Sequence, residues 1–323
     1  MKKKALITGI SGQDGSYLSE YLLENNYEVY GIIRRNSIVE HQRNRIEKLD
    51  NVINLEYGDL LDNNSLNRIL KSVMPDEIYN LAAQSHVRIS FEIPHFTVQT
   101  NGIGVLNMLE AFRVICPSAK FYQASSSEMF GRSVDEDNCQ RESTPFQPTS
   151  PYGCAKALAF NFTKHYRFAY SLFCSNGILF NHESPRRGSN FVTNKVVKTA
   201  VQIKLGMTDK LVLGNMDSYR DWGHSRDYVR AMNMILNHDS ADDFVVSTGK
   251  TRSVRDLCKY VFKKLNLDMD KHIFQDEKFM RPEELKYLKG DSTKARNLLK
   301  WEPLISFEEM IDEMIDHWLD IFK

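Results

Sequence analysis

Cysteine is scarce in this chain of 323 residues, which has five: Cys116, Cys139, Cys154, Cys174 and Cys258. Their number is odd, and they lack the close pairs that zinc-binding and redox motifs require. The histidines likewise show no metal-ligand spacing, so the sequence predicts no metal site. Scattered thiols of this kind are typical of a reducing compartment, and we expect a cytoplasmic protein.

The chain also lacks an excess of charge of either sign, since 42 lysines and arginines balance 42 aspartates and glutamates. A neutral chain carries no overall electrostatic footprint for nucleic acid or for an anionic membrane. Any anionic ligand must therefore be held by local arginines. The first apolar run, residues 5–7, is too short for a signal-peptide core or a membrane span. We expect neither nucleic acid nor a membrane as a partner.

Strand-like and helix-like segments alternate over the first 180 residues. Strands are predicted over residues 5–8, 28–33, 54–57, 77–80, 120–124 and 175–179. Helical spacing of apolar residues is found over residues 15–25, 65–73, 102–114 and 150–170. This alternation predicts an α/β fold, a Rossmann-type doubly wound parallel sheet with helices on both faces.

The composition of the sequence changes beyond about residue 181, where loops rich in Arg, Asn, Gly and Pro begin. Short helical patterns follow, and the last of them covers residues 307–322. A strand-like run at residues 244–248 indicates a late return to the sheet. We therefore predict a dinucleotide-binding domain of residues 1–180 plus about 219–250. A smaller, interleaved substrate domain is predicted from residues 181–218 plus 251–323.

A glycine-rich loop follows the first strand and opens the first helix, with the sequence Gly9-Ile10-Ser11-Gly12-Gln13-Asp14-Gly15. Glycine permits a tight turn and lets a pyrophosphate approach the amides at the helix N-terminus. Many turns carry glycines for backbone reasons alone, but the strand–loop–helix context favours a dinucleotide site.

The second strand ends in Arg34-Arg35, where an NAD-preferring fold usually carries an acidic residue. Two guanidinium groups suit the 2′-phosphate of NADP, and the alternative is a solvated basic loop. Within this fold, Asp59-Leu60 would reach the adenine edge and residues 81–85 would lie under the ribose on the nicotinamide side.

Four reactive side chains are predicted to meet at the carboxyl edge of the sheet. Ser126 and Glu128 follow the fifth strand, while Tyr152 and Lys156 lie one turn apart on one helical face. Lys156 can lower the pKa of the phenol, which then acts as a base. Glu128 supplies a second base, so oxidation followed by loss of water is favoured over oxidation alone. The alternative is that the serines cap a turn and Glu128 is an exposed acid.

Arginines also cluster late in the chain, at Arg186-Arg187, Arg220 and Arg281. Their planar groups suit a nucleotide diphosphate. Surface salt bridges with Asp221 or Glu284 are the alternative for each of them.

The longest motifs resemble those of the GDP-mannose 4,6-dehydratase family, extended short-chain dehydrogenases/reductases that modify nucleotide sugars. These motifs are residues 7–15, 80–87, 176–188 and 220–224, with the pair Gly290-Asp291. The resemblance runs nearly from end to end. It implies a GDP-sugar substrate, a homodimer or homotetramer, and a cycle in which hydride moves from C4 to C6 of the sugar by way of NADP.

The resemblance also implies the positions of the site residues. The catalytic residues would be Ser126, Glu128, Tyr152 and Lys156. The NADP contacts would be Gly9, Ile10, Ser11, Gly12, Gln13, Asp14, Arg34, Arg35, Asn36, Ser37, Asp59, Leu60, Leu81, Ala82, Ala83, Gln84, Ser85, Lys156, His182 and Arg187. The substrate contacts would be Asn181, Lys195, Arg220, Arg281 and Glu284. Ser126 stands where the family has a threonine, which keeps the hydroxyl and loses a methyl group.

Three alternatives stay open at this point. A related sugar such as a GDP-manno-heptose differs from GDP-mannose by one hydroxymethyl group, which small changes in pocket shape accommodate. A nucleotide-sugar 4-epimerase shares the fold and the Tyr/Lys pair but has no need of a second carboxylate, so Glu128 disfavours it. A dinucleotide sensor without chemistry would not need the full set of four reactive side chains.

Overall fold

The structure is a computed structural model that describes residues 2–36, 43–280 and 282–323. Two predicted site residues, Ser37 and Arg281, lie outside the described residues.

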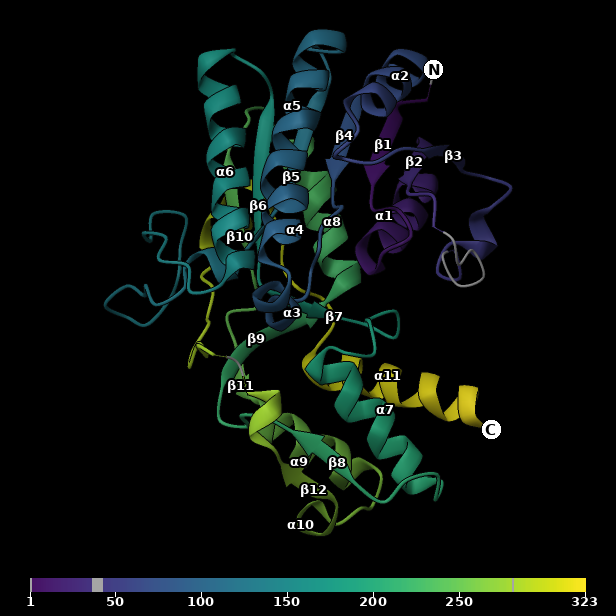
Figure 1. The fold of residues 1–323 in the computed structure, drawn as a ribbon, viewed down its shortest axis with the longest axis vertical. Helices are drawn as coiled ribbons and strands as arrows, with labels where there is room; N and C mark the ends of the chain where they lie inside the picture. Colours follow the sequence, from purple (N-terminus) through teal and green to yellow (C-terminus); the bar gives the residue numbers. More distant parts are fainter. Residues whose placement is uncertain (1, 37–42, 281) are drawn as a thin grey trace.

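A seven-stranded parallel sheet forms the larger part of the molecule, in the order β10-β6-β5-β4-β1-β2-β3 (Figure 1). Its strands are β1 (Lys4–Thr8), β2 (Glu28–Ile33), β3 (Asn54–Tyr57), β4 (Glu77–Asn80), β5 (Lys120–Ser126), β6 (Cys174–Leu179) and β10 (Asp243–Val246). The chain moves outward from β1 in one direction and then from β4 in the other, which is the doubly wound order. The predicted fold class is confirmed.

Helices cover both faces of this sheet because successive strand residues point to opposite sides. Ala5 and Ile7 of β1 pack under α1 (Gln13–Glu24) and α8 (Ser225–Leu236). Leu6 packs on the other face, under α2 (Asn63–Val73), α5 (Gly104–Ile115) and α6 (Pro151–Ala169). Between β4 and α5 the chain forms α3 (Val87–Glu92), α4 (Pro94–Val98) and the π-helical turn η2 (Gln99–Ile103).

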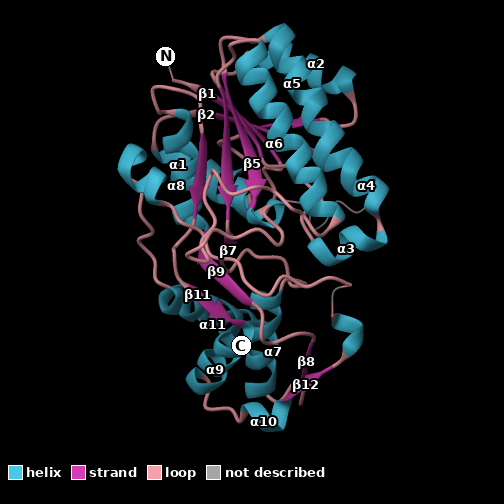
Figure 2. Cartoon of the chain, turned by 90° about the vertical axis from the view of Figure 1, so that its left-hand side faces the viewer, coloured by secondary structure: helices cyan, strands magenta, loops and turns pink. Residues whose placement is uncertain are grey.

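A smaller unit lies against the carboxyl edge of the large sheet (Figure 2). It contains a three-stranded sheet, β11 (Thr251–Ser253), β9 (Tyr219–His224) and β7 (Asn181–Glu183), and the pair β12 (Ile273–Gln275) and β8 (Leu211–Leu213). Its helices are α7 (Val192–Lys204), α9 (Val254–Lys264), α10 (Met269–His272) and α11 (Phe307–Phe322). The short turns of the chain are η1 (Glu47–Leu49), η3 (Ser127–Met129), η4 (Glu277–Phe279) and η5 (Ala295–Leu299).

The chain crosses between the two units more than once. Within the segment 219–250, α8 and β10 pack with the large sheet. Strand β9 differs, because it pairs with β7 and β11 outside that sheet. Among the residues that the structure describes, no helix has the length and apolar character needed to cross a bilayer.

Candidate functional site

The glycine loop between β1 and α1 is shaped for an anion. The amide of Gly12 donates to the carbonyl of Gly9 at 2.9 Å, and Gly9 has a φ of +71°. A Cβ atom on Gly15 would lie 2.3 Å from the Gly9 carbonyl oxygen, so only glycine fits there. The N-cap residue of α1 is Gly12, which has no side chain that could cap the helix. The first amides of α1 therefore remain able to bind a phosphate.

A second hollow of about 540 Å³ lies beside the ends of β2 and β3. Four of the residues predicted to contact a cofactor line it: Arg34, Arg35, Asn36 and Asp59. Leu60 does not line it, because its side chain is buried against the helices of the large sheet. Ile10 of the glycine loop is likewise fully buried. Leu60 and Ile10 can therefore contact a cofactor only through backbone atoms, and their side chains drop out of the predicted contacts.

The main cavity, of about 640 Å³, opens between the two units. All four predicted catalytic residues line it, together with ten of the other predicted contacts: Ser126, Glu128, Tyr152, Lys156, Asp14, Leu81, Ala83, Ser85, Asn181, His182, Arg187, Lys195, Arg220 and Glu284. Ala82 and Gln84 are not among its lining residues. The backbone of Gln84 is instead bonded in both directions to the side-chain amide of Asn101.

Two capped turns hold the catalytic side chains in this cavity. Strand β5 runs two residues further than predicted, so Ser126 ends it, and its hydroxyl accepts a hydrogen bond from the Glu128 amide at 3.3 Å. Ser150 caps α6 by accepting from the amide of Gly153 at 3.0 Å. The Ser126 side chain is close enough to the phenol of Tyr152 to act on its pKa, so the β5 turn and the first turn of α6 face each other.

Burial sets the protonation of the tyrosine and lysine. It raises the pKa of Tyr152 to about 12, and the hydrogen bond from Ser126 acts against this shift. It lowers the pKa of Lys156 to about 8. The Lys156 ammonium donates to the Ala124 carbonyl at 2.7 Å and lies 5.8 Å from the centre of the Tyr152 ring. The expected lowering of the phenol pKa by Lys156 is therefore not found. Desolvation is the main cause that raises the pKa of Tyr152, and Arg187 is a cation that acts to lower it.

His182 and Asp14 form a partly buried pair at the glycine loop. The ring Nε2 of His182 lies 2.8 Å from Asp14, and Nδ1 lies 2.7 Å from the Phe180 carbonyl. Burial acts to lower the pKa of His182, but the Asp14 carboxylate outweighs it and raises the pKa. Since both ring nitrogens have partners, His182 can act on a cofactor through Asp14 rather than by a direct ring hydrogen bond.

The far end of the cavity carries cations and one open acceptor. Arg220 is buried and donates to Glu284 at 2.7 Å and to the Leu285 carbonyl at 2.8 Å. Its partner is therefore Glu284 and not Asp221, whose carboxylate accepts from the loop at Thr248. The side-chain oxygen of Asn181 is buried without a hydrogen-bond partner among the described residues.

Two residues that sequence reasoning missed shape this end. Phe279 lines the cavity, and the Lys195 ammonium lies 3.9 Å from the centre of its ring. Glu183 is buried and lies 3.0 Å from the Nε atom of Arg187, which it orients toward the cavity. The position of Phe279, two residues before the predicted substrate contact Arg281, could have indicated that Phe279 lies at the site. No comparable signal in the sequence indicates that Glu183 does.

The doubly wound sheet, the glycine loop and the Tyr152/Lys156 pair together define the extended short-chain dehydrogenase/reductase class. The description "GDP-mannose 4,6 dehydratase" belongs to the family model that matches residues 6–314. A GDP-mannose 4,6 dehydratase 1 of Arabidopsis thaliana is 47% identical over 332 residues, which are 100% of this chain and 91% of the relative. The Homo sapiens GDP-mannose 4,6 dehydratase is 45% identical, over 99% of this chain and 92% of its own.

Solved structures share the fold at low identity. RMD from Pseudomonas aeruginosa, complexed with NADPH, has a TM-score of 0.82 and 22% identity, over 99% of this chain and 100% of that one. This likeness shows the fold, and the family follows from the full-length matches at far higher identity. The chain belongs to the GDP-mannose 4,6 dehydratase family. The 4-epimerase alternative is not favoured.

Proposed function

We propose that this chain converts GDP-mannose to a GDP-4-keto-6-deoxy sugar and water. Membership of the family makes it a hydro-lyase. The observation that carries the assignment to this site is the presence of the Glu128 carboxylate beside Tyr152 and Ser126 in one buried cavity. A simple dehydrogenase or a 4-epimerase has no need of that carboxylate. Its position suits a second proton transfer after oxidation.

NADP is the cofactor that we propose. The uncapped N-terminus of α1 suits its pyrophosphate, and Arg34 and Arg35 in the 540 Å³ hollow suit its 2′-phosphate. The RMD structure is of a complex with NADPH, which supports the same choice. When bound, NADP accepts the hydrogen of the sugar C4 and returns it to C6. Gly9 to Asp14 and Lys156 would hold it, with Ser37 as a further predicted contact.

The side chains at the sheet edge would share the proton transfers. Ser126 relays the proton of the C4 hydroxyl to the neighbouring Tyr152, which accepts and keeps it as the base. Lys156, held on the Ala124 carbonyl, orients the bound ribose. Glu128 then removes the C5 proton, which the new C4 carbonyl makes acidic, and assists the departure of the C6 hydroxyl as water. Oxidation must therefore precede elimination.

The far end of the cavity would bind the nucleotide. Arg220 and the predicted Arg281 would hold the diphosphate, because planar guanidinium groups make paired bonds to phosphate oxygens. Asn181, Lys195 and Glu284 would contact the remaining polar groups. Guanine is proposed as the base on the strength of the family.

We propose that the cofactor and the nucleotide sugar are bound mainly by different units of the molecule. The cofactor would be held mainly by residues 1–180 plus about 219–250, and the nucleotide sugar mainly by residues 181–218 plus 251–323. Arg220 of β9 would be an exception on the sugar side, and His182 and Arg187 would be exceptions on the cofactor side. We further propose a cytoplasmic homodimer or homotetramer that serves deoxysugar biosynthesis. The five free thiols suit a reducing compartment.

Product analysis tests the function. Purified enzyme with NADP should convert GDP-mannose, and mass spectrometry should show the loss of one water. In deuterated water, one solvent deuterium should appear at C5, while the C4 hydrogen moves to C6 of the same molecule. The proposal would be overturned by an enzyme that turns over UDP-glucose or dTDP-glucose and ignores every GDP-sugar.

A further inference from the structure

The motif Gly290-Asp291 has no part in the chemistry proposed above, yet it ends a segment that crosses from one unit of the molecule to the other. This segment, residues 283–291, is called the strap below. At one end it carries Glu284, which lines the main cavity, and at the other end it carries Asp291 outside the cavity. The strap therefore connects the substrate end of the site to a remote polar network.

The cavity end of the strap is bonded to β9. Arg220 donates to the Glu284 carboxylate at 2.7 Å and to the Leu285 carbonyl at 2.8 Å. The backbone of Tyr219 makes two hydrogen bonds to the strap. Its amide donates to the Lys286 carbonyl at 2.8 Å, and its carbonyl accepts from the Leu288 amide at 3.2 Å. Any shift of the strap would therefore move the guanidinium group of Arg220.

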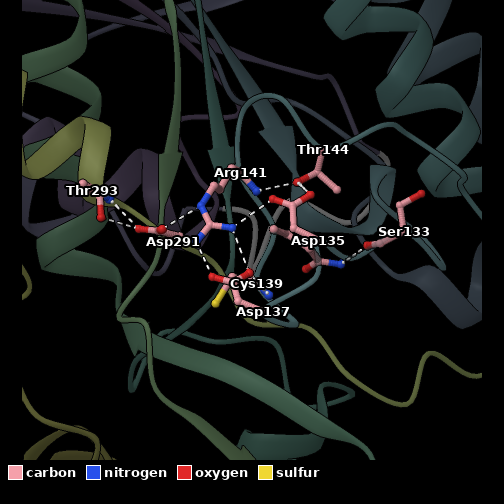
Figure 3. A network of polar contacts seen from close by, with 9 residues as sticks. Ser133, Asp135, Asp137, Cys139, Arg141, Thr144, Asp291 and Thr293 are labelled. Atoms are coloured by element: carbon pink, nitrogen blue, oxygen red, sulfur yellow. Dashed lines mark hydrogen bonds and ion pairs between the residues drawn. The ribbon is translucent and has the colours of Figure 1, made fainter.

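The other end of the strap is held by the loop that follows the catalytic turn, as Figure 3 shows. The Arg141 guanidinium group donates to Asp291 at 2.8 Å and to Asp135 and Asp137 at 2.9 Å each. Beside it, the amide of Asp291 donates to the Gln140 carbonyl at 3.0 Å. One cation thus joins three carboxylates, and without it these carboxylates would repel one another across the junction.

Apolar packing links the strap to the catalytic turn as well. Leu285 and Leu288 of the strap are buried in a cluster with Met129 and Phe130. These two residues directly follow Glu128 in the chain. At the end of the strap, a Cβ atom on Gly290 would lie 2.4 Å from the Ser247 side chain, so the strap also fits closely against the large sheet.

We propose that Arg141 is a positioning residue for nucleotide-sugar binding. By holding Asp291 to the loop, it fixes the strap, and the strap in turn fixes Arg220 and Glu284 in the cavity. An isolated surface ion pair contributes little, but a guanidinium group shared by three carboxylates holds a defined geometry. The inference rests on the proposed function, since it assigns the strap to the binding of the GDP-sugar.

The experiment compares Arg141→Met, Arg141→Lys and the control Arg113→Met in the holoenzyme with NADP. Arg113 is matched because its side chain is 35% exposed, against 32% for Arg141, and it pairs with Glu110 on the distant helix α5. Arg141→Met should raise KM for GDP-mannose, and Kd for GDP measured by calorimetry, by about five- to tenfold. The kcat and the bound NADP should stay within about twofold. Arg141→Lys keeps the positive charge but loses the planar guanidinium group, so its KM and Kd should lie between those of the wild type and of Arg141→Met.

A second variant covers the case in which Arg141→Met does not fold. Asp291→Asn keeps the shape of the side chain and weakens the same junction, and it should raise KM and Kd in the same way. The proposal is overturned if KM and Kd stay within twofold, or if kcat and bound NADP fall together with them, as a general loss of structure would produce. A wild type that binds no GDP would instead refute the proposed function, a result visible before any variant is compared.

Discussion

Replacing Glu128 with glutamine should separate the two halves of the reaction. Residue Glu128 is 7% exposed, and its backbone amide is held by the Ser126 cap, so an amide side chain of the same volume should keep the local structure. Burial is the main cause of the raised pKa of Tyr152, and the Glu128 carboxylate adds to it. Removing that negative charge should make the phenol more acidic. The first step, oxidation at C4, should therefore survive the substitution.

The elimination step should not survive. General bases contribute roughly 10²- to 10⁴-fold to rate, so product formation by Glu128→Gln should fall at least about 10²-fold, which corresponds to about 2.7 kcal/mol in the barrier. In a mixed sample of enzyme and GDP-mannose, mass spectrometry should detect a 4-keto sugar that retains its C6 hydroxyl. Glu77→Gln is the control, because that carboxylate is also buried but lies in β4, outside the main cavity.

Two results would refute this reasoning. A Glu128→Gln enzyme that forms the product at the wild-type rate would show that another group removes the C5 proton. A wild type that only inverts the configuration at C4 would show that no elimination takes place, and Glu128 would then have a structural role.

Three further predictions concern binding and pH. Arg35→Ala should lower the ratio of NADP to NAD affinity, and an unchanged ratio would remove Arg35 from the site. Arg220→Ala should raise KM for GDP-mannose by an order of magnitude or more, since charged hydrogen bonds contribute about 1.5–3 kcal/mol each; steady-state kinetics would contradict this if KM moved less than twofold. The Asp14–His182 pair should stabilise the fold most between about pH 3.8 and 6.5, the ordinary pKa values of the two groups. The lowered pKa of Asp14 gives stability that is lost as pH falls, and the raised pKa of His182 gives stability that is lost as pH rises through it. The Tm difference between wild type and Asp14→Asn should therefore narrow on both sides of that window, and a difference that does not vary with pH would contradict the assignment.

The large sheet was predictable because its strands are short apolar runs between clear turn and helix signals. The predicted ranges for β2, β3 and β4 match the structure, and β5 differs by two residues at its carboxyl end. That difference arose because Ser125 and Ser126 have the polarity of a loop. They are nevertheless buried in the strand, and Ser125 bonds to Asn176 of β6.

The site was predictable only in part. Motif spacing predicted the four reactive residues, and the structure brings them to one cavity. Spacing did not predict that the Leu60 side chain points into the core, or that Arg187 is paired with Glu183. These features depend on packing between segments far apart in the sequence, which local patterns do not encode. The pKa of Tyr152 was missed for the same reason, since it depends on the depth of burial.

The return of α8 and β10 to the seven-stranded sheet has a consequence for dividing the protein into fragments. A fragment that ended at residue 180 would leave the outer edge of β6 unpaired and would uncover the apolar side of α1. Unpaired strand edges and uncovered apolar faces promote aggregation. Truncation therefore cannot isolate the large-sheet unit. A chimera with a related enzyme must exchange these two late segments together with the first 180 residues.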